Sequence, residues 1–365
     1  MKKTMLPFTF AVLFLASLSG KPAQAVELEI HSSSPYAAQI GMDSFNYSVR
    51  KRLDAVRMGA IDSVYAGAAP FGSDSALAAA PATRSASVRS SVSRRQLDCV
   101  YYNGFTVWGD LYQTWAKQTG RDGSSGYRYT ATAPAVGFDW TSGPVTIGFA
   151  TTYNFGKLKG GDANQSLKAR AWDMEVYGQY NAAKYYISAG IGYGYNHYKG
   201  TRWDSVSLPH FADYHSHSVN LDGEFGLKFN FSDFLITPHA GLRLFHDRRG
   251  AFAEDNTLAG NPVESGRASY YVWEVPLGVN LAYAIRAGGA MIIPQVKAAW
   301  IPELARRRGN VAVASAPRRA RNGFLIGVGL EAKISRTLGV HVDYNANFRN
   351  NAHEHHWNLG VGFTF

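Results

Sequence analysis

The sequence predicts an all-β protein: a transmembrane, antiparallel, up-and-down β-barrel of twelve strands, with an N-terminal amphipathic helix in its pore. Three observations support this fold class. The last twelve residues alternate strictly between large apolar and small polar side chains. Short turns alternate with long polar loops over the last two thirds of the chain. Apolar residues reach 46% of the composition, yet form no long run beyond the N-terminus, which excludes ordinary transmembrane helices.

The closing segment, residues 354–365, is predicted to be a strand with lipid on one face and a watery lumen on the other. Successive side chains of a strand point to opposite faces. His356, Asn358, Gly360 and Gly362 share the small, polar face. The opposite face carries the residues that we also predict to be the signal for barrel assembly: Trp357, Leu359, Val361, Phe363 and Phe365.

Residues 1–25 are predicted to be a cleaved secretory signal peptide. Lys2 and Lys3 form its basic start, residues 6–18 its apolar core, and residues 23–25 a small-x-small cleavage site. An N-terminal membrane anchor is the alternative, but the apolar core is too short to span a bilayer. Export to the bacterial cell envelope follows, and the predicted barrel places the chain in the outer membrane. The single cysteine, Cys99, excludes an internal disulfide framework.

The segment before the barrel divides into three parts. Residues 26–42 carry no clear pattern. Residues 43–66 place apolar side chains at helical spacing, which predicts a helix of roughly 33 Å, about the thickness of a membrane. Residues 67–98 are rich in Ala, Ser, Pro and Arg and resemble a linker. The cations of the predicted helix are Arg50, Lys51, Arg52 and Arg57.

The barrel is predicted to occupy residues 99–365. Its loops at 118–126, 156–167, 199–215, 248–268 and 301–321 are long, whereas the intervening turns are short, as in outer-membrane barrels. The even strand count places both ends of the barrel on the short-turn, periplasmic side. The twelve predicted strands are 106–117, 127–138, 145–155, 168–180, 185–198, 216–231, 234–247, 269–283, 291–300, 322–333, 338–348 and 354–365.

Face assignment predicts that the apolar sides of these strands face lipid, because a closed lumen has no room for large aromatic residues from every strand. Tryptophans near strand ends would form interfacial girdles: Trp108, Trp115, Trp172, Trp273, Trp300 and Trp357. The polar faces would place carboxylates in the lumen, opposite the cations of the helix. These predicted lumen acids are Asp173, Glu175, Asp222, Glu224, Glu274, Glu331 and Asp343.

The formal net charge is +10, and the excess lies in short arginine clusters. Such clusters can bind nucleic acid, but in an exported barrel we expect other partners, either lipopolysaccharide phosphates or an acidic lumen. Solvated loop charge is the simplest alternative. The main clusters are residues 50–52, 94–95, 306–308 and 318–321.

The chain resembles the translocator barrel of the classical (type V) autotransporter family over about residues 100–365. The resemblance lies in the order and spacing of short motifs. These are Val107-Trp108-Gly109 in the first strand, residues 237–242 followed by 250–254, residues 276–279, and the terminal Phe365.

The resemblance implies a helix threaded through a twelve-stranded pore and an N-terminal passenger carried to the cell surface. Residues 50–57 resemble the basic pore helix of the family. An ordinary periplasmic amphipathic helix is the alternative. Two departures matter. Asn46-Tyr47-Ser48 stands where some relatives cleave themselves at an Asn-Asn pair, and the segment before the helix is too short for the usual passenger.

Two histidine groups invite a metal interpretation: His353, His355 and His356, and His210, His215 and His217. Alternation places His355 and His356 on opposite faces, and no metal-ligand motif accompanies either group. An outer-membrane phospholipase would need Ser, His and an orienting group at one height on the outer face, and no such set is found. We therefore predict neither metal, cofactor nor enzyme activity.

The predicted function is an outer-membrane, autotransporter-like barrel that anchors or translocates an N-terminal segment, with a short or vestigial passenger. A stand-alone channel or surface-interaction barrel without a secreted passenger is the alternative. The expected partners are outer-membrane lipid and lipopolysaccharide, the barrel assembly machinery and periplasmic chaperones. Nucleic acid is not expected, and the protein is predicted to be monomeric.

Overall fold

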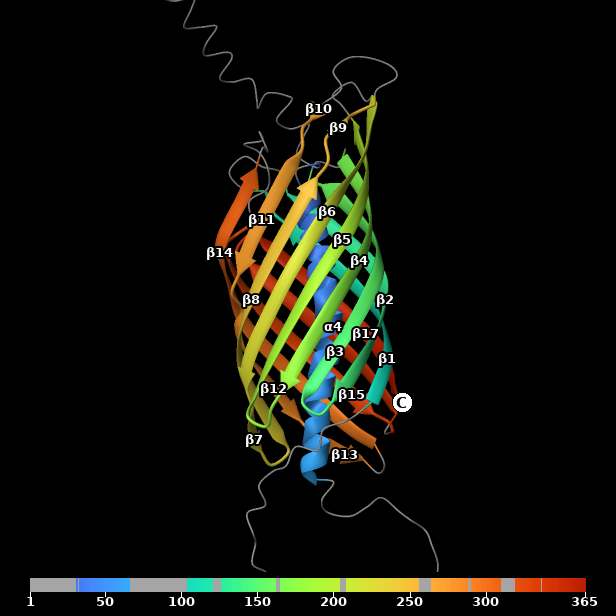
Figure 1. Cartoon of the computed structure of the whole chain (residues 1–365). Helices are drawn as coiled ribbons and strands as arrows, with labels where there is room; N and C mark the ends of the chain where they lie inside the picture. The colour runs from blue at the N-terminus through green and yellow to red at the C-terminus, as the bar shows by residue number, and fades with distance from the viewer. Residues whose placement is uncertain are drawn as a thin grey trace, which may run out of the picture.

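The computed structural model of the chain shows a closed β-barrel with a helix along its interior (Figure 1). The predicted signal peptide and linker lie outside the described residues. The structure describes residues 31, 33–65, 104–120, 126–161, 165–203, 208–255, 264–287, 290–309, 319–335 and 337–365.

The helix is α4, Ser34–Tyr65. It begins nine residues before the predicted start, because residues 34–42, which show no apolar periodicity, lie inside the barrel rather than at a surface. Every strand pairs antiparallel with its neighbours. The principal strands are β1 (Gly104–Gln118), β2 (Tyr127–Ser142), β3 (Val145–Gly160), β4 (Gln165–Asn181), β5 (Tyr185–Trp203), β6 (Pro209–Leu227), β8 (Phe234–Arg249), β11 (Ala268–Glu274), β12 (Leu277–Tyr283), β14 (Ala290–Gly309), β15 (Asn322–Lys333), β16 (Leu338–Arg349) and β17 (Ala352–Thr364).

Shorter pieces complete the twelve strands. β7 (Phe229–Phe231) continues β6, and β13 (Ile285–Ala287) continues β12. β11 and β12 form one strand interrupted at Val275 and Pro276, and both pair with β8 and β14. A proline nitrogen carries no hydrogen for the ladder, so an interruption at Pro276 is expected. A separate hairpin, β9 (Phe252–Ala253) with β10 (Glu264–Ser265), lies at the long-loop end (Figure 1).

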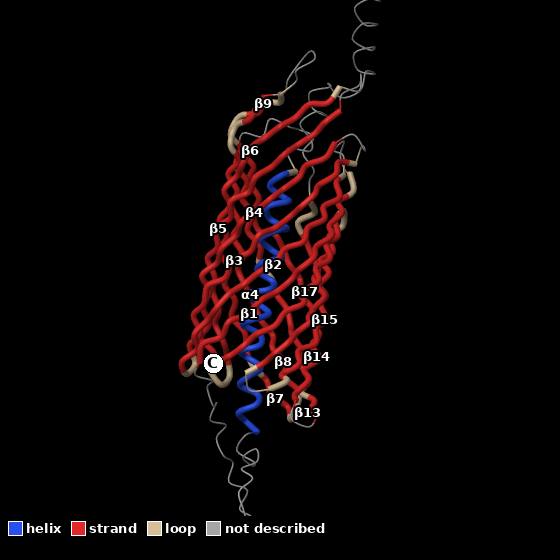
Figure 2. The backbone as a smooth tube through the Cα atoms, turned by 90° about the vertical axis from the view of Figure 1, so that its right-hand side faces the viewer, coloured by secondary structure: helices blue, strands red, loops and turns tan. Residues whose placement is uncertain are grey.

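β17 closes the barrel by pairing with β1. Thirteen residue pairs join the two strands, from Thr106 with Thr364 to Gln118 with Ala352. Phe365 extends this seam through its backbone, donating to the Phe105 carbonyl at 2.9 Å. The predicted fold class is therefore confirmed. Figures 1 and 2 show the closed barrel in two views turned by 90° from one another.

Three predicted loops are shorter than expected. β3 runs to Gly160 and β4 begins at Gln165, so most of the predicted loop 156–167 is strand. The structure continues β5 to Trp203 and begins β6 at Pro209, so most of the predicted loop 199–215 is strand. β14 runs to Gly309, into the predicted loop 301–321. Alternation persists in β5 and β6, whereas in β14 it slips at Leu304 and Ala305, where the register with β11 shifts. Lipid no longer requires an apolar outer face in these stretches, and polar residues on both faces resemble loop sequence.

The outer face carries the large apolar side chains, as alternation predicts. Trp115, Trp172, Trp273, Trp300 and Trp357 are exposed on this face. The assignment of Trp108 to a girdle is wrong: its ring is buried in the lumen, over Gly137, and donates to the Tyr177 hydroxyl at 2.9 Å. The absence of a Cβ at Gly137 leaves the space that the indole fills.

Candidate functional site: the helix-filled lumen

α4 runs along the axis of the barrel from the long-loop end to the short-turn end (Figures 1 and 2). Its first turn contacts the long-loop end, where the Tyr198 hydroxyl donates to the Ser34 carbonyl at 3.2 Å. Its Met58 packs with Leu235 and Met291 near the short turns. The N-terminus of the helix is therefore the end that points toward the long loops.

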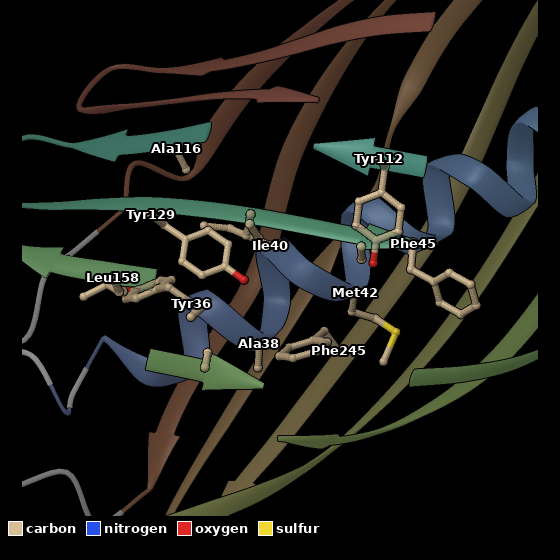
Figure 3. Close-up of a cluster of buried hydrophobic side chains, with 14 of the residues drawn as sticks. Tyr36, Ala38, Ile40, Met42, Phe45, Tyr112, Ala116, Tyr129, Leu158 and Phe245 are labelled. Atoms are coloured by element: carbon tan, nitrogen blue, oxygen red, sulfur yellow. The ribbon is translucent and has the colours of Figure 1, made fainter. Parts of the chain in front are cut away.

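The first half of the helix is held by apolar and aromatic contacts. Tyr36, Ile40, Met42 and Phe45 lie among rings and methyl groups from lumen-facing strand positions (Figure 3). The rings of Tyr36 and Tyr270 approach to 5.4 Å between centroids. Aromatic pairs of this geometry contribute beyond the area that they bury. The lumen lining is thus not purely polar, which alternation alone did not predict.

The middle of the helix contacts the lumen through neutral hydrogen bonds. The Ser44 hydroxyl lies 2.8 Å from that of Thr114 and 3.0 Å from Nδ1 of His356. Asn358 donates to the Ser48 hydroxyl at 2.7 Å. The Asn46 amide, with its nitrogen toward Glu175, donates to that carboxylate at 2.8 Å. Ser44, Asn46 and Ser48 therefore each bond a specific side chain of the barrel.

Arg50 and Arg52 form the strongest charged contacts between helix and barrel. Nη2 of Arg50 lies 2.8 Å from Oδ2 of Asp222, and Nη1 lies 3.6 Å from Glu224. Arg52 binds Asp139 through two parallel bonds, of 2.7 Å from Nε and 2.9 Å from Nη2. Bidentate guanidinium–carboxylate pairs add geometric specificity to the attraction between the charges.

Lys51 and Arg57 complete the charged half. Nζ of Lys51 is 3.3 Å from Asp343 and 3.9 Å from Glu331. Arg57 lies 3.6 Å from Glu224 and pairs with Asp54 on the next turn of the helix. Its guanidinium also lies over the Tyr186 ring, 3.9 Å from the centroid. One further ion pair has the opposite arrangement, with the anion on the helix and the cation on the barrel: Lys297 donates to Asp54 at 2.7 Å.

Among the described residues, two of the predicted lumen acids form neither an ion pair nor a hydrogen bond with the helix. Asp173 is buried beside Gly194 and Met42 and forms no ion pair among the described residues. Glu274 pairs instead with Arg349 of β16, at 2.5 Å, within the barrel wall. The other five lie within the helix contacts described above: Glu175, Asp222, Glu224, Glu331 and Asp343.

Sequence reasoning missed the partner of Arg52. The predicted strand ends at residue 138, which leaves Asp139 in a turn. In the structure β2 continues to Ser142, and the Asp139 side chain points into the lumen, where it is fully buried. Extending the alternation of residues 127–137 by one step would have found it. Tyr177 and Trp108 continue the network, since the Tyr177 hydroxyl donates to Asp139 at 3.2 Å.

A second charged cluster surrounds the start of the helix at the long-loop end. Glu254 accepts two bonds from Arg202, of 3.1 and 2.6 Å, and lies 3.4 Å from Nε2 of His31. Arg249 donates to the His31 carbonyl at 3.1 Å. Nδ1 of His31 lies 3.2 Å from the Tyr214 hydroxyl. His31, just before the helix, is therefore held directly by Glu254, Arg249 and Tyr214.

The same cluster shifts the pKa values of its members. Burial raises the pKa of Glu254, but hydrogen bonds from His31 and Arg202 outweigh it and lower the pKa to about 2. Burial lowers the pKa of His31 below 6.5, against the opposing effect of Glu254. A neutral His31 satisfies the geometry, with Nε2–H donating to Glu254 and Nδ1 accepting from Tyr214.

The two histidine groups do not converge on a common point. His353 and His355 lie on the outer face, whereas His356 points into the lumen toward Ser44. His210 is likewise buried, 3.7 Å from Glu254, whereas His215 and His217 face outward. Within the described ranges, no group of three or more His, Cys, Asp and Glu side chains is arranged to hold a metal ion.

The helix leaves little open space in the part of the lumen that the structure describes. A small pocket beside Asp43 is bounded by Gln39, Asn46, Arg243 and Glu274. In the described part of the chain, no helix combines the length and apolarity needed to cross a membrane. The arrangement is that of a plugged cylinder whose plug is attached by charge pairs.

Comparisons with known proteins agree with this geometry. The family model described as the autotransporter beta-domain matches residues 107–345. The translocator domain of the autotransporter NalP from Neisseria meningitidis is similar in structure, with a TM-score of 0.62, 14% identity, and coverage of 73% of this chain and 90% of that one. The beta domain of the Bordetella autotransporter BrkA gives a TM-score of 0.57 at 14% identity, covering 72% and 100%. No curated protein sequence matches the chain.

Proposed function

Because this chain belongs to the autotransporter β-domain family of outer-membrane translocator barrels, we propose that α4 seals the pore and anchors an N-terminal segment at the cell surface. The observation that carries the proposal is the direction of the helix. Its N-terminus lies at the long-loop end and its C-terminus at the short-turn end. Long loops are extracellular in outer-membrane barrels, so the chain that precedes the helix leaves on the outer side.

The contacts of the helix support a stable seal. Arg50, Lys51 and Arg52 are all directed at lumen carboxylates. Withdrawing the helix would leave these carboxylates facing one another across the lumen without their cations. Breaking a buried pair by removing one partner costs about 3–5 kcal/mol. Several such pairs on one helix therefore favour the occupied pore over the open one.

Planar-bilayer conductance tests the seal. The full chain should conduct weakly, and a chain lacking residues 34–65 should conduct several times more, because the helix occupies the cross-section of the lumen. A full chain that conducts as strongly as the deletion would contradict the seal and favour a stand-alone channel. Heat-modifiable migration on gels verifies that both barrels are folded.

Labelling of intact cells tests the direction of the helix. Cysteine is placed at residue 30, before the helix, or at residue 62, near its end, in a chain carrying Cys99→Ser. A membrane-impermeant maleimide should label residue 30 in intact cells, and residue 62 only after the outer membrane is permeabilised. The opposite pattern would reverse the orientation of the barrel and refute surface anchoring.

Export and assembly belong to the same proposal. We propose that residues 1–25 are removed as a signal peptide, and that periplasmic chaperones and the barrel assembly machinery deliver the chain as a monomer. Trp357, Leu359 and Phe363 support this proposal, since they project from the closing strand onto its outer face. N-terminal sequencing of the protein from outer membranes tests the cleavage, which should leave a chain that begins after Ala25.

We further propose that the barrel has no catalytic role. Asp139, Asp222 and Asp343 are engaged by cations of the helix, and the exposed strand positions are mostly large and apolar. Reconstituted protein should not hydrolyse phospholipids above the rate of empty liposomes. Hydrolysis that survives removal of residues 34–65 would contradict this assignment.

A further inference from the structure

We propose that the outer face of β1–β5, at the long-loop end, binds the phosphate groups of a glycolipid of the lipid A type in the outer leaflet. This inference rests on the outer-membrane orientation proposed above. The surface is called the cationic wall here. It consists of Lys117, Arg128, Lys157, Lys159, Lys168, Arg170 and Lys199, all of which are exposed.

The register of the strands makes the cationic wall continuous. Lys117 faces Arg128, and Arg128 faces Lys159 on its other side. Lys157 faces Lys168, and Lys168 in turn faces Lys199. Two rows of like charge therefore cross neighbouring strands. The alternation of the strands turns every one of these side chains outward.

Like charges directly opposite one another destabilise a sheet. Among the described residues, no ion pair joins Lys117, Arg128, Lys157, Lys159 or Lys168 to a carboxylate. Asp213 lies at the far edge of the cationic wall, where it pairs with Lys199 at 3.4 Å and His197 at 2.5 Å. Repulsion of this kind is relieved when an anion is shared between neighbouring cations.

The cationic wall begins where the membrane-facing aromatic residues end. On β1, Lys117 is the next outward position after Trp115. On β4, Arg170 and Lys168 follow Trp172, and on β5 Lys199 lies two outward positions beyond Tyr195. Outward positions are about 7 Å apart along a strand. Aromatic rings mark the headgroup level, so the cations lie at or just above the phosphates of the outer leaflet.

The opposite wall of the barrel lacks this arrangement. In the described parts of β8, β11, β14 and the segment leading into β11, the exposed cations near the long-loop end are Arg248, Arg267 and Arg307. Arg248 faces Ser269 and Arg307 faces Tyr271, so neither has a cation opposite it on β11. A ligand that needs several cations and an adjoining apolar surface fits the cationic wall. A lipid with phosphorylated sugars and acyl chains has both features, whereas a soluble polyanion uses only the charge.

The test compares two triple variants of the full chain, folded into phosphatidylcholine nanodiscs. The first carries Lys157→Gln, Lys159→Gln and Lys168→Gln. The second carries Arg248→Gln, Arg267→Gln and Arg307→Gln and is the matched control, since it loses the same charge from the opposite wall. Bisphosphorylated lipid A and its dephosphorylated form are titrated in, and binding is measured by native mass spectrometry.

The cationic-wall variant should bind bisphosphorylated lipid A about a hundredfold more weakly than wild type, from the contribution of each cation near an anionic surface. The control should stay within about threefold of wild type, and removal of the phosphates should abolish the difference. Equal binding by wild type and both variants would overturn the proposal, as would an equal loss in both variants.

Heparin in detergent distinguishes a soluble polyanion from a lipid. Heparin binding that requires the cationic wall, combined with lipid A binding that does not, would assign the wall to a soluble partner and overturn the lipid assignment. Conductance of the same variants reports on the pore separately. None of the substituted residues touches α4, so a failure of the seal and a failure of the lipid site give different readouts.

Discussion

At the scale of single residues, Arg52 shows how the lumen recognises the helix. Asp139 holds it through two bonds and is itself oriented by the Tyr177 hydroxyl, which receives the indole N–H of Trp108. Four side chains from α4, β1, β2 and β4 thus form one connected network. Such networks fix a unique geometry when every member is satisfied.

Replacing Arg52 with alanine should loosen the helix, because it leaves the fully buried Asp139 carboxylate without its cation. We expect a loss of about 3–5 kcal/mol in helix docking, seen as higher conductance in planar bilayers. Adding Asp139→Asn should recover part of the loss, since no charge then remains unpaired. Arg170→Ala, on the outer face, serves as the control. Unchanged conductance in Arg52→Ala would show that the pair does not hold the plug.

His31 makes the outer end of the helix sensitive to pH. Burial keeps its pKa below 6.5 in the folded protein, so as pH falls below 6.5 the released state takes up a proton that the docked state resists. Docking at this end should therefore weaken from pH 7 toward pH 5. Glu254, with a pKa of about 2, stays ionised and contributes no change over this window.

Hydrogen exchange of the first helical turn measures this effect. Wild type should exchange faster at pH 5 than at pH 7, after correction for the intrinsic rates. His31→Gln, which does not titrate, should show a smaller difference between the two pH values. An equal pH dependence in both proteins would exclude His31 as the group that responds.

At the scale of elements, α4 fits the barrel by steric complementarity as well as by charge. Gly41 lies where the helix passes β3, and a Cβ there would stand 2.9 Å from Nδ2 of Asn154. Tyr36, on another side of the helix, packs instead against the rings of Tyr127 and Tyr270 (Figure 3). The close approach at Gly41 therefore sets how near the helix lies to this part of the wall.

Gly41→Leu should displace the helix, because the longer side chain cannot fit beside Asn154. We expect increased conductance and faster proteolysis of the helix in the folded barrel. Asn154→Ala in the same chain should restore much of the seal by making room. Ala55→Leu, at a partly exposed position on the same helix, is the matched control. Equal effects of the two leucines would indicate a general disturbance rather than the close approach at Gly41.

At the scale of the whole molecule, the seam between β1 and β17 removes the last free edges of the sheet. An open edge in lipid would leave backbone groups without partners. The terminal Phe365 contributes a backbone bond to Phe105 while its side chain is 80% exposed. Its ring thus adds little to the packing of the folded barrel.

Deletion of Phe365 should reduce assembly more than stability. The folded barrel loses the backbone bonds with Phe105, about 1 kcal/mol each, whereas a recognition signal for the assembly machinery would lose its terminal aromatic residue. We expect much less folded protein in the outer membrane, with unchanged conductance for each folded molecule. Phe365→Tyr should assemble normally. Normal assembly of the deletion would exclude this residue from the signal.

Much of the barrel could be predicted because its strands obey a local rule. A strand between lipid and a lumen alternates residue by residue, and turns alternate in length, so strand count and facing follow from short windows of sequence. The rule weakens beyond the membrane. There β5 and β6 continue through polar residues, whose sequence predicts a loop. Trp108 follows the alternation, since it lies on the lumen side with Asp110 and Tyr112. It departs from the expectation that large apolar residues face lipid, because a glycine on the neighbouring strand makes room for its indole in the lumen.

The sequence by itself determined the closed twelve-stranded barrel, the basic helix and the acidic character of the lumen, because these depend on periodicity and composition along the chain. Only the tertiary structure decided which acid meets which cation, where the helix begins, and which cations on the outer wall face one another. These features depend on register between strands far apart in sequence and on the rotation of the helix inside the barrel. A rotation of the helix by one residue would pair Arg52 with a different group. A shift of one residue in strand register would disperse the cationic wall.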